Sequence, residues 1–586
     1  MVPTDALATT HPLAMTHADL EASRPASLAA LQQAAAETVA DFVARLPQPQ
    51  QLDLQALFAA LAARPERVQQ IQQRFYREQL ALFAQILGPS PAPAAGERGD
   101  ADPRFQAPEW RALPFFRLLE ACYRRNAQWL QEVLDAAELP PVSARRLRFA
   151  LGQMVDALAP TNFPITNPEA VRTALESGGE SLRAGLANLR ADLARGRLSM
   201  SDPGAFEVGR NLAVTDGAVV YENPIAQLIQ YRPRQARVHA RPLLVVPPFI
   251  NKYYILDLQP HNSFVRFALD RGLQVFLVSW RNVPAELGGS SWEDYIRGGV
   301  LEPLDAVLDV SRARSANALG FCVGGTLLAT ALAVMTRPAR VASLTLLATM
   351  LDYADVGEIG VYVDEASVRQ TEREHAAGGR VSGARLAAAF ASLRANELIW
   401  HFVVDNYLLG RTPRAFDLLH WNCDSANLPG RLYAWYLRNL YLDNNLRVPG
   451  RLRLCGRAAD LGRLRMPSYL LATREDHIVP WRSAYASTRL LSGRIEFVLG
   501  ASGHVAGVIN APAAGRRQYW VNGNLDGGAD AWLAGATVQP GSWWNHWAQW
   551  LLPKSGRLVA APQALGSAAR PPIEAAPGRY VREPAD

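Results

Sequence analysis

The chain has 586 residues, of which 49% are apolar and 19% charged, and its formal net charge is +6 at pH 7. These values predict a globular protein of more than one domain and exclude a disordered or fibrous chain. A charge of +6 on this length gives no reason to expect a nucleic-acid partner, but it is compatible with an anionic small substrate.

The cysteines and the N-terminal residues indicate the cellular compartment in which the protein is expected. Four cysteines in the whole chain have no paired spacing, so we expect neither a disulfide framework nor a metal site. The opening residues MVPTDALATTHPLAM lack the basic and apolar runs of a secretory signal. We therefore expect a reducing, cytoplasmic compartment and no metal or other cofactor.

The first 200 residues have mainly helical patterns and predict an N-terminal helical domain over residues 1–200. Residues 1–24 are expected to be disordered, and 88–102 form a Pro/Gly/Ala-rich linker. One helix should begin at Pro65, a residue favoured in the first turn. Its apolar positions recur on one helical face, which indicates a packing surface. Further helices are expected over residues 28–46, 114–137, 141–158 and 167–197.

The pattern changes near residue 200 to strands alternating with helices, which predicts a parallel sheet covered on both faces. Strands are expected over residues 219–221, 225–231, 243–246, 273–280, 316–319, 341–349, 469–473 and 495–500, and helices over 292–310 and 326–335. The alternation stops over residues 351–448, which are aromatic-rich and helical in pattern. We predict that this segment is a cap inserted into a catalytic domain spanning residues 201–586.

The last part of the chain carries a tryptophan cluster at helical spacing. It indicates either a docked helix or a surface for a polymer or partner, and the residues after Leu558 are expected to be extended. The cluster comprises Trp543, Trp544, Trp547 and Trp550.

A tight turn at Gly320-Phe321-Cys322-Val323-Gly324-Gly325 joins a predicted strand to a predicted helix. Glycines two residues to either side of Cys322 match the G-x-nucleophile-x-G elbow of α/β hydrolases, with Cys where Ser is usual. Two other interpretations exist. Residues 315–336 carry no charge and are long enough to span a bilayer, although the glycines favour a buried strand–turn–helix. Cys322 could also be a buried core thiol.

An acid and a histidine follow later predicted strands in the order that this fold requires. Asp476 comes after residues 469–473, and His504 comes after residues 495–500. His477 directly follows the acid, so we interpret it as a supporting residue and not the general base. The backbone N–H groups of Val323 and of Ile250 or Asn251, in the loop after the 243–246 strand, are the expected oxyanion donors.

The roles follow from thiol chemistry. A free thiol is mostly protonated at pH 7, so a histidine must take its proton, and a carboxylate can hold that histidine in the useful tautomer. A thiolate that attacks a thioester forms another thioester, which stays activated for transfer to an alcohol. Cys at the elbow therefore favours acyl transfer over hydrolysis.

The chain resembles class I poly(3-hydroxyalkanoate) synthases over nearly its whole length, more loosely in the N-terminal part. Phe321 and Val323 beside the cysteine resemble class I more than class II, and Ala426 is a mild departure where Thr is expected. The matching stretches are Gly320–Gly325, Pro247–Leu258, Val278–Asn282, Arg474–Trp481, Gly500–Asn510, Trp421–Asn422 with Asp424, Asn427–Gly430 and Asn162–Pro168.

The resemblance implies an α/β-hydrolase fold with an inserted cap, preceded by a mainly helical domain. It implies a cytoplasmic homodimer that associates with polyester granules and granule-associated proteins. The substrate would be (R)-3-hydroxyacyl-coenzyme A of short chain, polymerised with release of coenzyme A. Asp476 would either orient His504 or act on the substrate hydroxyl, and Trp421 would lie in a dimer contact, a cap contact or the core. Two alternatives remain: an acyl-coenzyme A thioesterase on the same fold, and a non-enzymatic granule-coating protein.

Overall fold

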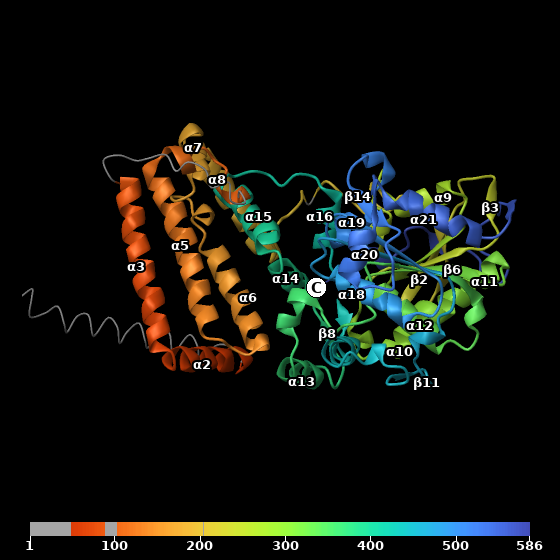
Figure 1. The fold of residues 1–586 in the computed structure, drawn as a ribbon. Coiled ribbons are helices and arrows are strands. Elements are labelled where there is room, and N and C mark those ends of the chain that lie inside the picture. Colours follow the sequence, from red (N-terminus) through yellow and green to blue (C-terminus); the bar gives the residue numbers. More distant parts are fainter. Residues whose placement is uncertain (1–47, 88–101, 203, 586) are drawn as a thin grey trace, which may run out of the picture. The chain divides into compact units, whose positions relative to one another are not determined.

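A computed structural model describes residues 48–87, 102–202 and 204–585 (Figure 1). The described residues fall into two compact units. One contains α2 (Gln48–Ala62), α3 (Pro65–Leu87) to residue 85, and residues 124–152, which include most of α5 (Pro114–Ala136) and α6 (Pro141–Ala157). The helices predicted from residues 65, 114 and 141 are thus confirmed. The helix predicted over 28–46, and residues 88–101 of the predicted linker, lie outside the described residues.

Polar and aromatic contacts hold the helices of this first unit together. The Arg146 guanidinium on α6 donates to the carboxylate of Asp53 on α2 at 2.6 Å. On the face between α3 and α5, Ile71 is buried and the Phe75 ring lies 5.0 Å from the Trp129 ring. The predicted apolar face of the 65–87 helix is therefore a packing surface.

The helix predicted over residues 167–197 is wrong as a single element. It divides into α7 (Pro168–Glu176) and α8 (Glu180–Arg195), and both belong to the second compact unit. Gly178 and Gly179 separate the two with φ values of +59° and +88°, outside the right-handed helical region. The Asn167 side chain caps α7 by accepting from the Ala170 N–H. The domain boundary at residue 200 stays a prediction.

The core of the second unit is an 11-stranded sheet in the described residues. Its spatial order is β15 (Thr537–Pro540), β14 (Gln518–Val521), β13 (Ile495–Gly500), β12 (Ser468–Thr473), β7 (Val341–Leu347), β6 (Ala316–Phe321), β4 (Leu243–Val246), β5 (Val275–Trp280), β2 (Ala226–Tyr231), β1 (Gly217–Glu222) and β17 (Glu574–Ala575). The strands from β13 to β5 are parallel, whereas those outside them are antiparallel. The predicted parallel sheet is correct at the centre and wrong at both edges.

Helices cover both faces of this sheet, as predicted (Figure 1). Neighbouring residues of β4 point into different cores, Leu244 and Val246 into one and Leu243 and Val245 into the other. The first core includes α10 (Trp292–Ile296), α11 (Glu302–Ser311) and α12 (Val323–Val334), and the second includes α9 (Phe264–Asp270) and α21 (Trp543–Leu551). A π-helical turn, Arg297–Leu301, interrupts the helix predicted over 292–310.

The tryptophan cluster forms the docked helix, α21. Trp543, Trp544 and Trp547 are buried, and the Trp547 indole N–H donates to the Thr345 hydroxyl on β7 at 3.1 Å. These three side chains are packed in the core and are not available as a polymer-binding surface. After β16 (Leu558–Ala560) the chain is mostly irregular, and its β17 strand closes one edge of the sheet.

Between β7 and β12 the chain forms a mainly helical segment, as predicted for the cap. It contains α13 (Glu365–Glu374), α14 (Gly383–Ser392), α15 (His401–Val403), α16 (Asp417–Cys423) and α17 (Gly430–Tyr436), with two-residue strands β8 (Arg380–Val381) and β9 (Leu428–Pro429).

The uncharged stretch 315–336 divides between β6 and the 12-residue helix α12. In the described part of the chain, no helix has the length and apolar character needed to cross a membrane. The membrane-spanning interpretation of this stretch is therefore wrong.

Candidate active site

Cys322 lies at the turn between β6 and α12 and precedes the first residue of the helix. Its backbone has φ 54° and ψ −131°, a conformation that a residue with a Cβ rarely adopts. The Cys322 N–H donates to the Leu347 carbonyl on β7 at 2.8 Å, which fixes the turn to the sheet. A Cβ on Gly320 would overlap the Gly325 backbone, and one on Gly324 would overlap the Pro247 carbonyl. The two glycines are therefore required sterically, as the elbow motif predicts.

Asp476 and His504 lie just beyond the ends of β12 and β13, which are parallel neighbours. The His504 Nδ1 lies 2.7 Å from the Asp476 Oδ2. The same carboxylate accepts from the Thr473 hydroxyl at 3.0 Å and from the Ile478 and Val479 N–H groups at 2.9 and 2.8 Å. No part of the Asp476 side chain is exposed. The structure thus brings these two predicted residues together.

The His504 ring lines the same cavity as Cys322, and the Cys322 sulfur is one of the groups that raise the His504 pKa. The His504 ring stacks on the Phe321 ring, with ring centres 5.6 Å apart and planes at 25°. Cys322, His504 and Asp476 therefore form one contiguous set, and the histidine is held from both sides.

Electrostatics in this buried set favour charge separation. Burial alone would lower the pKa of His504, but the neighbouring Asp476 carboxylate and the Cys322 sulfur outweigh it and raise that pKa well above its ordinary value. Burial would raise the pKa of Asp476, but His504 and the backbone N–H donors hold that pKa below its usual range. Asp476 is therefore ionised, and His504 binds a proton readily.

His477 faces the same cavity but differs from His504 in its electrostatics. Burial, together with the positive charge of Arg394, lowers the pKa of His477 to about 4. The ring is therefore neutral at physiological pH.

Cys322 and His504 line a cavity of about 320 Å³. One wall comes from the loop after β4, including Ile250 and Asn251. Val323, the residue after Cys322, is the first residue of α12, where backbone N–H groups have no acceptor within the helix. The other wall is apolar and comes from the cap, through Leu386, Phe390, Leu398, Phe416, Leu418 and Trp421. The segment predicted as a cap thus forms one wall of the cavity at Cys322.

Sequence reasoning missed the Thr473 hydroxyl, which supports Asp476, although its place at the end of a predicted strand three residues before the acid was a usable signal. It also left Trp421 open. The Trp421 indole N–H donates to the Lys252 carbonyl at 2.7 Å, and the ring is buried. Trp421 therefore joins the cap to the loop after β4. No cluster of three or more metal-binding side chains occurs in the described ranges.

Comparison with known proteins agrees with this geometry. Residues 101–268 match the family described as the N-terminus of poly-beta-hydroxybutyrate polymerase (PhaC), and residues 242–511 match the alpha/beta hydrolase fold. The poly(3-hydroxyalkanoate) polymerase subunit PhaC of Cupriavidus necator is 50% identical over 531 residues, which are 89% of this chain and 90% of that protein. The corresponding subunit of Rhizobium meliloti is 40% identical over 82% of this chain and 79% of its own length. Poly(3-hydroxyalkanoate) polymerase 1 of Ectopseudomonas oleovorans is 40% identical over 86% and 90%.

Proposed function

This chain belongs to the poly(3-hydroxyalkanoate) polymerases, which are acyltransferases, and from that premise we propose that Cys322 carries the growing polyester, His504 moves its protons and Asp476 orients His504. The enzyme polymerises hydroxyacyl-coenzyme A. The observation that carries the assignment of residues is the contiguous Cys322, His504 and Asp476 set in a cap-covered apolar cavity.

The acylation step begins with transfer of the Cys322 proton to the His504 Nε2. The sulfur then attacks the thioester carbonyl of the substrate, and the oxyanion receives hydrogen bonds from the backbone N–H groups of Val323 and of Ile250 or Asn251. When the tetrahedral intermediate collapses, coenzyme A leaves and takes the proton from His504. The products are an acyl thioester on Cys322 and free coenzyme A.

Elongation reuses the same base. His504 takes the proton of the 3-hydroxyl of the next substrate, and that oxygen attacks the Cys322 thioester. An ester bond forms, and the Cys322 thiolate leaves and is reprotonated by His504. The lengthened chain still ends in a coenzyme A thioester, so Cys322 attacks it again and releases one coenzyme A per unit added.

Asp476 is better suited to orient His504 than to contact substrate. Its carboxylate already accepts from His504, Thr473 and two backbone N–H groups, and its side chain has no exposed surface. The substrate hydroxyl therefore has no free oxygen of Asp476 to reach while this arrangement persists. This supports His504 as the base in both steps.

The finer features are proposals as well. An apolar cavity of about 320 Å³ at Cys322 supports a short acyl side chain, and (R)-3-hydroxybutyryl-coenzyme A is the proposed substrate. We also propose a cytoplasmic homodimer that associates with polyester granules and granule-associated proteins. Exposed apolar side chains on α7 and α8, among them Leu175 at 78% and Leu193 at 72%, support an apolar partner.

The test is to incubate the purified full chain with (R)-3-hydroxybutyryl-coenzyme A and to measure coenzyme A release, insoluble polymer and free 3-hydroxybutyrate together. A polymerase incorporates one hydroxybutyryl unit into polymer for each coenzyme A that it releases. Free acid in place of polymer would indicate the thioesterase, and no coenzyme A release would indicate the granule-coating protein.

A further inference from the structure

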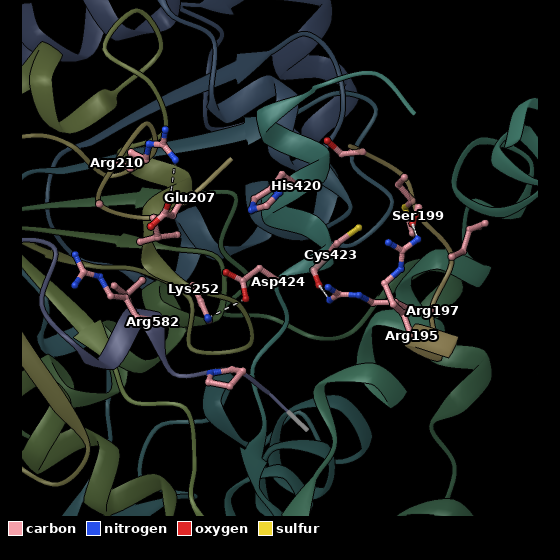
Figure 2. Close-up of a pocket in the computed structure, with 17 residues that line it drawn as sticks. Arg195, Arg197, Ser199, Glu207, Arg210, Lys252, His420, Cys423, Asp424 and Arg582 are labelled. Atoms are coloured by element: carbon pink, nitrogen blue, oxygen red, sulfur yellow. Dashed lines mark hydrogen bonds and ion pairs between the residues drawn. The ribbon is translucent and has the colours of Figure 1, made fainter. Parts of the chain in front are cut away.

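A second cavity of about 540 Å³ lies in the same compact unit and is lined by basic side chains (Figure 2). Its walls come from residues 195–201 at and after the end of α8, residues 207–210, Lys252, the end of α16 and residues 581–584 near the C-terminus. We call it the basic pocket. The cationic side chains that line it are Arg195, Arg197, Arg210, Lys252 and Arg582.

Carboxylates neutralise only part of this charge. Arg195 pairs with Asp192 at 2.5 Å, Lys252 with Asp424 at 2.8 Å, and Arg210 with Glu207 at 3.3 Å.

Arg197 and Arg582 have no carboxylate partner among the residues that the structure describes. The Arg197 Nη1 donates to the Cys423 backbone carbonyl at 3.1 Å, which leaves most of its guanidinium donors free. In Figure 2, Arg197 lies on one side of Asp424, and Lys252 and Arg582 lie on the other. An anion in the basic pocket would therefore meet guanidinium groups from two directions.

The basic pocket and the active-site cavity lie along the same two segments of chain. Asn251 lines the active-site cavity, and the next residue, Lys252, lines the basic pocket. Trp421 on α16 lines the active-site cavity, whereas Asp424, the residue directly after α16, lines the basic pocket. The Trp421 N–H bond to the Lys252 carbonyl joins the two segments.

We propose that the basic pocket binds the phosphate groups of the coenzyme A substrate whose thioester reacts at Cys322; this rests on the proposed function. Coenzyme A carries its phosphates at the end of a long arm, remote from the thioester sulfur. Guanidinium groups form paired hydrogen bonds with phosphate oxygens, and a volume of about 540 Å³ falls in the usual range for a nucleotide-sized ligand. A free nucleotide presents the same chemistry, so the experiment distinguishes the two sources.

The kinetic test compares two substrates that share the acyl group. Arg197→Gln and Arg582→Gln should each raise KM for 3-hydroxybutyryl-coenzyme A about tenfold, because a charge-assisted hydrogen bond to phosphate is lost, with kcat within about twofold. The same variants should leave KM unchanged for the 3-hydroxybutyryl thioester of pantetheine, which lacks phosphate. Arg582→Lys should restore part of the affinity. Arg232→Gln, which removes an exposed partner of Asp216, is the matched control and should change neither KM.

Direct binding gives a second readout. Calorimetry with adenosine 3′,5′-bisphosphate and the full-length Cys322→Ala protein should detect binding that weakens about tenfold in Arg582→Gln. Unchanged KM for the coenzyme A substrate in both variants overturns the proposal, even if the nucleotide binds, because the pocket would then hold a separate effector. An equal loss with both substrates also overturns it, since the arginines would then support the fold. If the wild type consumed no acyl-coenzyme A, the proposed function would fail, and absence of nucleotide binding would separately dismiss the pocket.

Discussion

Replacing Asp476 by asparagine keeps the size of the side chain but reverses the two hydrogen bonds that Oδ2 makes with His504 and Thr473. The amide oxygen can still accept from the Ile478 and Val479 N–H groups, now bonded to Oδ1 at 2.9 and 2.8 Å. The amide NH₂ then occupies the place of Oδ2 and faces the His504 Nδ1, where the distance is 2.7 Å. An NH₂ donates to Nδ1, so the imidazole proton moves to Nε2. In that tautomer His504 cannot accept the Cys322 proton.

The expected loss is about 10⁴-fold in the rate of acylation, the size seen when an orienting aspartate is replaced in an analogous triad, and equivalent to about 5.5 kcal/mol of activation free energy. The assay is a single-turnover burst: enzyme in excess over (R)-3-hydroxybutyryl-coenzyme A, rapid acid quench, and quantification of released coenzyme A. Elongation is measured separately as insoluble polymer.

Glu475→Gln is the matched control, since Glu475 is exposed and adjacent in the chain, and it should acylate at the wild-type rate. Circular dichroism and thermal unfolding of Asp476→Asn should establish that the variant is folded. Acylation within tenfold of wild type with failed elongation would refute the orienting role and assign Asp476 to the substrate hydroxyl. Full turnover would remove Asp476 from the mechanism.

Three further substitutions test the elbow, the second histidine and the cap. Gly324→Ala places a Cβ against a backbone carbonyl, so it should abolish activity and lower the free energy of unfolding by more than about 2 kcal/mol. Gly152→Ala, the control with open space around it, should do neither. Chemical denaturation measures the stability of the two variants, and coenzyme A release measures their activity. The pKa of His477 is about 4 in the folded protein and 6.5 in the unfolded chain, so the unfolded chain binds the extra proton and the free energy of unfolding falls as pH decreases from 6.5 to 4. His477→Gln should remove about 2 kcal/mol of the stability that is lost between pH 7 and 5. An unchanged dependence of stability on pH, measured by urea unfolding, would contradict this. Asp424→Asn breaks the ion pair with Lys252 and should speed amide exchange in α16 at least several-fold; unchanged exchange would show that this contact does not hold the cap.

Much of the site was predictable because it depends on strand ends. The elbow around Cys322 and the positions of Asp476 and His504 follow from buried runs that end just before each residue, and parallel neighbours bring those ends to one edge. The glycine spacing is a steric requirement, so it is visible in the sequence. The carboxylate contacts of Asp476 were less visible, because hydrogen bonds from Thr473 and two backbone groups depend on the path of a single loop.

Parts of the fold were not predictable from local pattern. A short connection between β1 and β2 makes that pair antiparallel. The apolar pattern of a strand does not show whether the strand runs parallel or antiparallel to its neighbour. The glycine pair Gly178-Gly179 indicated a break between two helices, but the helical periodicity of the residues on both sides favoured one continuous helix. The basic pocket could not be foreseen, because it is assembled from five separate stretches of the chain. The net charge of the basic pocket depends on which arginines form ion pairs with carboxylates in the folded protein.

The central claim is that the growing acyl chain is covalently bound to Cys322. The most direct measurement is to quench the enzyme during turnover of (R)-3-hydroxybutyryl-coenzyme A, digest it briefly with trypsin at neutral pH, where the thioester survives, and identify the acylated peptide by mass spectrometry. Hydroxybutyryl adducts should occur on the peptide that begins at Ser315 and contains Cys322, and they should be absent from the Cys322→Ala protein, which should make no polymer. Polymer made by Cys322→Ala, or an adduct on another residue with Cys322 unmodified, would contradict the mechanism.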